Sequence, residues 1–145
     1  MSLEPPQLTV YVDIVGDLFH YGHIRFLRSA RAMGDRLIVG VCGDEFCTTY
    51  KRPPILNAAE RAETIAGCRY VDQVVVDCPC PITREFIVEH DIGLVVHGDD
   101  LAPPALRHWY GAAMDLGIFA TVPYTEGIST SEIIDRINAA PMAPG

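Results

Sequence analysis

Residues 8–33 read LTVYVDIVGDLFHYGHIRFLRSARAM, in which a short apolar run leads through a glycine into a helical pattern. Residues 8–15 are rich in β-branched side chains, which favour an extended strand. Gly16 breaks this strand. Residues 18–33 then place apolar side chains on one side and arginines on the other, the pattern of an amphipathic helix that ends at Gly34. This region therefore predicts a buried strand followed directly by a helix.

The same alternation continues along the chain. Residues 36–42 (RLIVGVC) are nearly all apolar, which is typical of a strand covered on both faces of a sheet. Capping boxes begin at Asn57 (NAAE) and Ser129 (STSE), and they predict helices that reach about residues 68 and 139. The other predicted strands are 71–76, 93–97 and 119–122, and the other predicted helices are 83–90 and 103–116. This order predicts an α/β fold: a Rossmann-like, doubly wound, five-stranded parallel sheet with helices on both faces.

The composition is that of one globular domain. The 145 residues are 49% hydrophobic and 21% charged, which excludes a disordered chain. No apolar run approaches the ~18 residues of a membrane span. We expect one domain over residues 1–138 and a flexible tail over residues 139–145, where two prolines and small side chains cannot continue a helix. The net charge of −8 makes nucleic acids and anionic membranes poor partners.

Five cysteines are present, and their spacing gives no clear site. An odd number without a repeated C-x-x-C pattern fits neither a disulfide framework nor a zinc site, and the C-x-C pair Cys78 and Cys80 is weak evidence for a metal. We interpret the thiols as buried or idle groups in a reducing compartment. The first residues, MSLEPPQ, lack a basic segment followed by an apolar core, so no secretory signal is expected and the predicted location is the cytoplasm.

The sequence HYGH at residues 20–23 stands where ligands bind in a parallel sheet, just after a strand. Residues three apart in a helical turn share one face, so the imidazoles of His20 and His23 can contact one ligand. The start of a helix also favours an anion, and Gly22 would let a phosphate approach the backbone. The pattern predicts a phosphate site; the alternative is two incidental surface histidines, or one cap and one core residue.

A second helix start carries three consecutive hydroxyl side chains, Ser129, Thr130 and Ser131, two residues after Gly127. Such a segment can cradle an anion, although an ordinary capping box is the better interpretation of it when taken alone. Two helix starts of this kind at one edge of a sheet suggest one polyphosphate held between them.

Together, GDLFHYGH (16–23) and TEGISTS (125–131) resemble the paired signatures of the cytidylyltransferase branch of the H-x-G-H nucleotidyltransferases. The intervening segments ERAETI, RYVD and VVHGDD are also similar, so the resemblance extends from about residue 9 to residue 137. Enzymes of this branch join CTP to phosphoethanolamine, phosphocholine or glycerol 3-phosphate and release pyrophosphate. The resemblance implies a CTP-dependent cytidylyltransferase for a small phosphorylated alcohol, with a phosphoethanolamine-like acceptor favoured.

The resemblance also implies roles for individual residues. His20 and His23 would stabilise the five-coordinate transition state at the α-phosphorus. Lys51, the single lysine beside ten arginines, would bridge the CTP phosphates and the acceptor phosphate, and Cys80 would lie at the acceptor. Mg²⁺ would be held by the CTP phosphates, near Asp99, rather than by the protein alone. The expected nucleotide-binding residues are Val15, Gly16, Asp17, Gly22, Arg61, His97, Gly98, Asp99, Tyr124, Thr125, Glu126, Gly127, Ile128, Ser129, Thr130 and Ser131.

Two of these implications concern helix 57–68 and the segment after it. Arg61 lies in an E-R motif, and it either reaches a phosphate or forms an ion pair on the helix surface. Residues 69–72 (RYVD) resemble the segment through which the family forms dimers, so a homodimer is expected.

Three features depart from the family pattern. The usual G-x-F-D after the first strand is here residues 14–17 (IVGD), and Tyr124 replaces an arginine, which removes a fixed positive charge from the nucleotide site. Cys80 stands where choline- and ethanolamine-type enzymes have an aromatic residue, so a cation–π pocket is less expected. Trp109 and Tyr110 are expected to pack on the sheet rather than to supply such a pocket.

Three alternatives remain open. The acceptor could be a phosphonate or glycerol 3-phosphate, the nucleotide could be ATP in an adenylyltransferase, or the chain could be a degenerate, non-catalytic nucleotide-binding module. Ile14, Gly16 and Tyr124 favour the last alternative. Intact His20, His23 and Lys51 oppose it, because a module without catalysis has no physical need for them.

Overall fold

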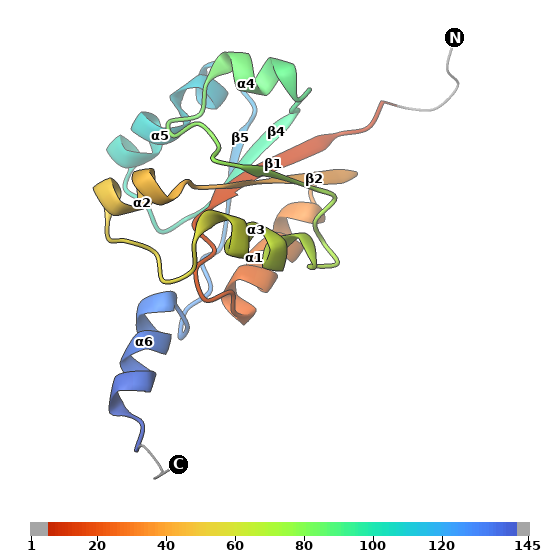
Figure 1. Ribbon diagram of the computed structural model, residues 1–145. Helices are drawn as coiled ribbons and strands as arrows, with labels where there is room; N and C mark the ends of the chain where they lie inside the picture. Colours follow the sequence, from red (N-terminus) through yellow and green to blue (C-terminus); the bar gives the residue numbers. More distant parts are fainter. Residues whose placement is uncertain (1–5, 142–145) are drawn as a thin grey trace.

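The fold is built on one five-stranded sheet in which all neighbouring strands are parallel (Figure 1). A computed structural model describes residues 6–141 of the chain. The strand order is β3-β2-β1-β4-β5, so the order reverses beside β1. The bounds are β1 (Thr9–Ile14), β2 (Arg36–Val41), β3 (Gln73–Val76), β4 (Leu94–Gly98) and β5 (Phe119–Val122). The predicted α/β class and parallel sheet are confirmed.

Helices cover both faces of the sheet, as the apolar strands require. On one face, Leu27 of α1 (Tyr21–Arg31) and Ile65 of α3 (Ala58–Ala66) are fully buried against β1 and β2. On the other face, Phe86 of α4 (Arg84–Glu89) and Ala113 of α5 (Pro103–Asp115) pack against Tyr11, Ile38 and Val95. Figure 1 shows these two pairs of helices on opposite sides of the strands. These two apolar layers fix the position of the sheet, and the loops that follow the strands meet at its carboxyl edge.

Two helical segments differ from the prediction. The sequence predicts the first helix from residue 18, whereas α1 begins at Tyr21, because Leu18 has a φ of 49° and His20 is the N-cap. The sequence also leaves residues 43–50 unassigned, whereas the structure contains α2 (Asp44–Tyr50) there. This helix has seven residues and buries only Cys47, so it carries too short an apolar pattern for sequence periodicity to detect.

The last helix, α6 (Thr130–Ala139), extends away from the sheet in Figure 1 and contains no buried residue. It includes Ala139, the first residue of the predicted flexible tail, and residues 142–145 of that tail lie outside the described residues. Within residues 6–141, no helix combines the length and the apolar character needed to cross a bilayer.

Candidate active site

The carboxyl ends of the strands surround a cavity of about 340 Å³. This volume is within the usual range for small-molecule sites, and the cavity lies where the strand order reverses, which is the expected ligand position in such a sheet. Its lining includes fourteen residues of the sequence-predicted site: Val15, Gly16, His20, Gly22, His23, Lys51, Cys80, His97, Gly98, Tyr124, Thr125, Ser129, Thr130 and Ser131.

The two histidines form a capping box at the start of α1. Nδ1 of His20 accepts a hydrogen bond from the Gly22 N–H at 3.1 Å, and Nδ1 of His23 accepts one from the His20 N–H at 3.1 Å. A nitrogen that accepts a backbone N–H carries no proton, so each neutral ring holds its proton on Nε2. Both rings line the cavity, and each therefore offers one N–H donor to a bound ligand.

Both imidazoles favour the neutral form. Burial lowers the pKa of His20 below its usual value. Burial and the neighbouring His20 ring lower the pKa of His23 to about 4, although Asp17 opposes this shift. The ring centroids are 3.8 Å apart, so two positive charges at this distance would repel strongly. Neutral rings with fixed Nε2–H groups can donate to an oxyanion without losing the helix cap.

Gly22 is needed for packing. A Cβ on Gly22 would lie 2.9 Å from Cε1 of His20 and 2.9 Å from Cγ2 of Ile128. The absent side chain thus makes room for the His20 ring and for the buried Ile128, rather than only for a phosphate as the sequence suggests. Ile128 itself does not line the cavity and acts from behind Gly22.

The second helix start is joined directly to the first. Ser129 caps α6 by accepting a hydrogen bond from the Glu132 N–H at 3.0 Å, and Oγ1 of Thr130 donates to the Asp17 carbonyl at 2.7 Å. The predicted capping box is only half formed, because Glu132 pairs with Arg136 at 3.2 Å instead of reaching back to the cap. Ser129, Thr130 and Ser131 all line the cavity, so the predicted juxtaposition of two helix starts is present.

Lys51 follows α2 and lines the same cavity. The chain after it is held by the buried Asp17, whose carboxylate accepts hydrogen bonds from the Ile55 N–H at 2.7 Å and the Leu56 N–H at 2.9 Å. Asp17 therefore positions the loop behind the lysine and does not itself line the cavity.

Arg61 neither contacts a phosphate site nor forms a surface ion pair, so both sequence-based interpretations of it are wrong. Its side chain is 0% exposed, so it neither lines the cavity nor forms an ion pair on the surface of the helix. The guanidinium donates to the Val15 carbonyl at 2.6 Å, the Cys42 carbonyl at 2.8 Å and the Leu56 carbonyl at 2.9 Å. It also pairs with Asp44 at 2.7 Å. Arg61 is a positioning residue that joins the chain after β1 to the chain after β2.

The segment after β4 is also partly structural. Oδ1 of Asp99 accepts the Tyr124 N–H at 2.9 Å, so this carboxylate holds the loop after β5, and its neighbour Asp100 is the residue that lines the cavity. Nδ1 of His97 lies 2.9 Å from the Gly98 carbonyl, which can only accept, so Nδ1 carries a proton and donates to this carbonyl. Of the other predicted nucleotide contacts, Glu126 and Gly127 do not line the cavity.

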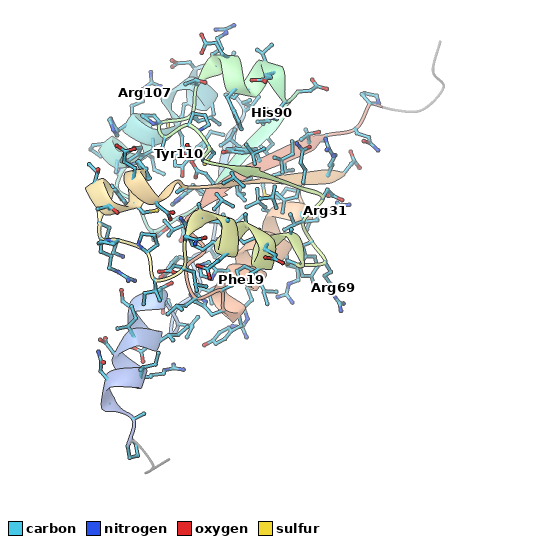
Figure 2. The ribbon with its side chains drawn as sticks, in the orientation of Figure 1. Phe19, Arg31, Arg69, His90, Arg107 and Tyr110 are labelled. Atoms are coloured by element: carbon cyan, nitrogen blue, oxygen red, sulfur yellow. The ribbon has the colours of Figure 1, made fainter. Side chains whose placement is uncertain are left out.

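Sequence reasoning missed a partly buried acid in the lining of the cavity. Asp13, in β1, lines the cavity, and Oη of Tyr110 donates to its Oδ1 at 2.6 Å. Burial raises the pKa of Asp13 to about 6, against the lowering effect of this hydrogen bond. The available signal was an acidic residue within the otherwise apolar run 9–15. Figure 2 shows Tyr110 on α5, far along the chain from β1.

Sequence reasoning also missed two aromatic side chains, Phe46 and Tyr50, which lie beside Trp109. Trp109 contacts Phe46 edge-on at 5.5 Å and Tyr50 edge-on at 5.3 Å, measured between ring centroids, and all three rings line the cavity. Trp109 and Tyr110 pack against the core on one face of the sheet, as expected, and both also line the cavity. The signal was hidden because Phe46 and Tyr50 lie on the undetected helix α2.

A family model described as cytidylyltransferase-like matches residues 17–136. The chain belongs to the cytidylyltransferase-like family. This confirms the resemblance that the two signature segments indicate.

Two curated relatives are similar to this cytidylyltransferase-like chain over most of its length. It is 42% identical over 141 residues to the ethanolamine-phosphate cytidylyltransferase of Dictyostelium discoideum, and 44% identical over 131 residues to choline-phosphate cytidylyltransferase A of Mus musculus. The matches cover 94% and 88% of this chain, but only 39% and 36% of the relatives. The chain therefore spans less than half the length of the curated relatives it matches.

Solved structures share the fold of this cytidylyltransferase-like chain at low identity. A lipopolysaccharide core biosynthesis protein from Thermoplasma volcanium superposes with a TM-score of 0.68 at 21% identity, covering 83% of this chain and 100% of that one. A pantothenate synthetase from Thermus thermophilus superposes with a TM-score of 0.62 at 14% identity, covering 94% and 66%. These likenesses show the fold alone.

Proposed function

We propose that this chain is the catalytic unit of a CTP-dependent cytidylyltransferase that transfers CMP to a small phosphorylated alcohol, with phosphoethanolamine favoured. The observation that carries the proposal is the capping box of His20 and His23, which fixes two Nε2–H donors at a cavity that Lys51 also lines. The names of the relatives support the reaction class.

The reaction is an in-line displacement. An oxygen of the acceptor phosphate forms a bond to the α-phosphorus of CTP, the bond from that phosphorus to the β-phosphate oxygen breaks, and pyrophosphate leaves with the electron pair. The acceptor phosphate is already ionised near neutral pH, so no general base is needed. Catalysis then consists of positioning and charge stabilisation.

In this mechanism the chain supplies donors and one mobile positive charge. Nε2–H of His20 and of His23 would donate to the oxygens of the five-coordinate phosphorus, and the ammonium of Lys51 would offset repulsion between CTP and the acceptor. Mg²⁺, when bound, would neutralise the CTP phosphates. Asp100, which lines the cavity, is better placed to meet a hydrated ion than Asp99, whose Oδ1 already holds the Tyr124 backbone.

The acceptor would place its alcohol end near Asp13. A carboxylate held by Tyr110, in a cavity that the aromatic rings of Trp109 and Tyr50 also line, suits a small ammonium group. Cys80 lines the cavity in place of an aromatic residue, so fewer rings surround the cation than a quaternary ammonium prefers. These features favour phosphoethanolamine over phosphocholine.

The proposal is tested by pyrophosphate release. The chain is incubated with CTP, Mg²⁺ and one acceptor: phosphoethanolamine, phosphocholine, glycerol 3-phosphate, 2-hydroxyethylphosphonate or 2-aminoethylphosphonate, with ATP as the parallel donor. Release with CTP and phosphoethanolamine is expected. Release with a phosphonate alone, or with ATP instead of CTP, would replace the proposed acceptor or nucleotide. No release together with no CTP binding would favour the non-catalytic module.

We also propose that the chain forms a homodimer through the segment after α3. Arg69 and Tyr70 of this segment line a shallow hollow together with Phe19, Ile24 and Cys68, among others. Sedimentation should give twice the 15.9 kDa chain mass. A single species of chain mass across a hundredfold concentration range contradicts the dimer. The cytoplasmic location stays a prediction.

A further inference from the structure

Three cysteine side chains meet at the floor of the cavity. Sγ of Cys42 lies 3.8 Å from Sγ of Cys80, Sγ of Cys78 lies 4.0 Å from Sγ of Cys80, and all three sulfurs lie within 4.8 Å of one another. Cys42 directly follows β2, whereas Cys78 and Cys80 follow β3. Because β2 and β3 are parallel neighbours, with Val41 opposite Val76, their ends bring the thiols together.

The separations match the geometry of a thiolate metal site. Zinc binds cysteine sulfur at about 2.3 Å in a tetrahedron, which separates two sulfur ligands by about 3.8 Å. Two of the three sulfur pairs already have this spacing within 0.2 Å. The sulfurs of the third pair, Cys42 and Cys78, lie within 4.8 Å, and each side chain can rotate about one bond to reach the metal spacing.

A second observation points to the same place. Tyr11 is completely buried, and within residues 6–141 its hydroxyl is the one buried side-chain polar atom that has no hydrogen-bond partner. A Cβ on Gly40 would clash with this hydroxyl and would lie 2.9 Å from Sγ of Cys78, so both atoms lie over Gly40 beside each other. A metal-bound thiolate is a strong acceptor, and it would give the Tyr11 hydroxyl the partner it lacks.

The surroundings suit a soft ion with one open position. Phe46 and Val15 pack against the thiols, so apolar side chains border the cluster. The backbone of Cys42 is fixed by the buried guanidinium of Arg61, which donates to the Cys42 carbonyl at 2.8 Å. Cys42 and Cys80 line the cavity, so an ion held by the three sulfurs would face the cavity with its fourth position.

We propose that Cys42, Cys78 and Cys80 form a three-thiolate site for Zn²⁺, with the fourth coordination position open to the cavity and filled by water or by a donor group of the bound acceptor. Binding of the ion by the three thiolates does not depend on the proposed transferase activity, because it is measured without turnover; the acceptor as a fourth ligand rests on the proposed function. A search for sequence motifs does not detect this site, because Cys42 follows a different strand from Cys78 and Cys80.

The test is a Zn²⁺ titration of the reduced, chelator-stripped chain under argon, in competition with a chromophoric chelator. One ion per chain is expected. Cys80→Ser should weaken binding about 100-fold or more, since loss of even an outer partner of a metal ligand costs 10- to 100-fold. The half-buried Cys80 is the mildest of the three to replace, and Cys78→Ser is the second variant.

Two cysteines outside the cluster serve as matched controls. Cys47 is buried next to it, with its Sγ donating to the Cys42 carbonyl at 3.8 Å, and Cys68 follows α3. Cys47→Ser and Cys68→Ser should bind Zn²⁺ as tightly as the unmodified chain. Co²⁺ in place of Zn²⁺ should give a thiolate charge-transfer band and the intense visible bands of tetrahedral coordination, and Cys80→Ser should lose or shift both.

Three results would overturn the proposal. The reduced chain could take up no zinc, whether or not two of the thiols form a disulfide on oxidation. Zinc could bind equally well after Cys80→Ser and Cys78→Ser, which would assign it to the histidines instead. Co²⁺ could bind without a thiolate band. Circular dichroism of each variant, compared with the unmodified chain, separates loss of the site from loss of the fold.

Discussion

The double use of His20 gives a prediction with two separate readouts. Its Nδ1 caps α1 by accepting a 3.1 Å hydrogen bond from the Gly22 N–H, and its Nε2–H is free to donate to an oxygen on the reacting phosphorus. His20→Ala removes both functions. His20→Asn removes only the donor, because asparagine is among the best N-cap residues and its side-chain oxygen can accept the same backbone N–H.

The loss of the cap should affect stability, whereas the loss of the donor should affect turnover. Loss of one N-cap costs about 1 kcal/mol, which for a chain of this size lowers Tm by roughly 3 °C. Loss of a transition-state donor lowers turnover about 100- to 1,000-fold. His20→Ala should therefore be less stable and nearly inactive, whereas His20→Asn should be nearly as stable as the unmodified chain and equally inactive.

The assays are urea unfolding followed by circular dichroism, and pyrophosphate release at saturating CTP and acceptor. CTP binding by calorimetry should change little in His20→Asn, because the donor acts mainly in the transition state. If His20→Asn turns over within threefold of the unmodified chain, the donor role is wrong. If His20→Ala and His20→Asn unfold at the same urea concentration, the cap contributes nothing and the fixed-tautomer argument loses its basis.

Three further predictions test the surroundings of the site. Arg61→Lys should lower the free energy of unfolding by about 3 kcal/mol in urea titrations, because the buried guanidinium that donates to three carbonyls is lost. Asp44→Asn changes only the exposed partner of Arg61 and should lower the free energy of unfolding by under about 1 kcal/mol. Equal losses in the two variants would show that the ion pair dominates. Tyr124→Arg should tighten CTP binding in calorimetry, since it adds a charge at a cavity-lining position that is 48% exposed; no change would mean that another group already fills this role. The pKa of His23 is about 4 in the folded chain and 6.5 ordinarily, so the unfolded chain binds more protons between pH 4 and pH 6.5. The resulting stabilisation, up to about 3 kcal/mol, is fully present above pH 6.5 and should be lost as the pH falls to 4. His23→Gln, which preserves the capping box, should flatten this part of the pH profile, and an unchanged slope would assign the titration elsewhere.

The sequence predicts those parts of the molecule that depend on neighbours along the chain. The strands, the caps at Asn57 and Ser129, and the histidine pair are all readable, because each rests on residues within four positions of one another. Their placement at one edge follows from the rule that parallel strands end on the same side.

The predictions that were wrong or missing concern contacts between residues far apart in the sequence, which depend on which strands and helices lie side by side. Asp13 and Tyr110 are 97 positions apart, and Arg61 reaches the Val15 carbonyl across 46 positions. Asp17 holds a loop 38 positions later. None of these pairs leaves a periodic or spaced signal, so a charged residue that serves the backbone looks the same in sequence as one that serves a ligand.

The histidine pair shows why one part of the site could be predicted from the sequence. A phosphate transition state needs donors whose protons cannot move to the wrong nitrogen, and a backbone N–H supplies this constraint when it occupies Nδ1. The required partner is the helix start itself, so the motif is local and survives in sequence. Below about pH 4, protonation of the His23 Nδ1 would break the cap and bring a positive charge against His20 in one step. Loss of the donor geometry and loss of the first turn of α1 are therefore expected to occur together.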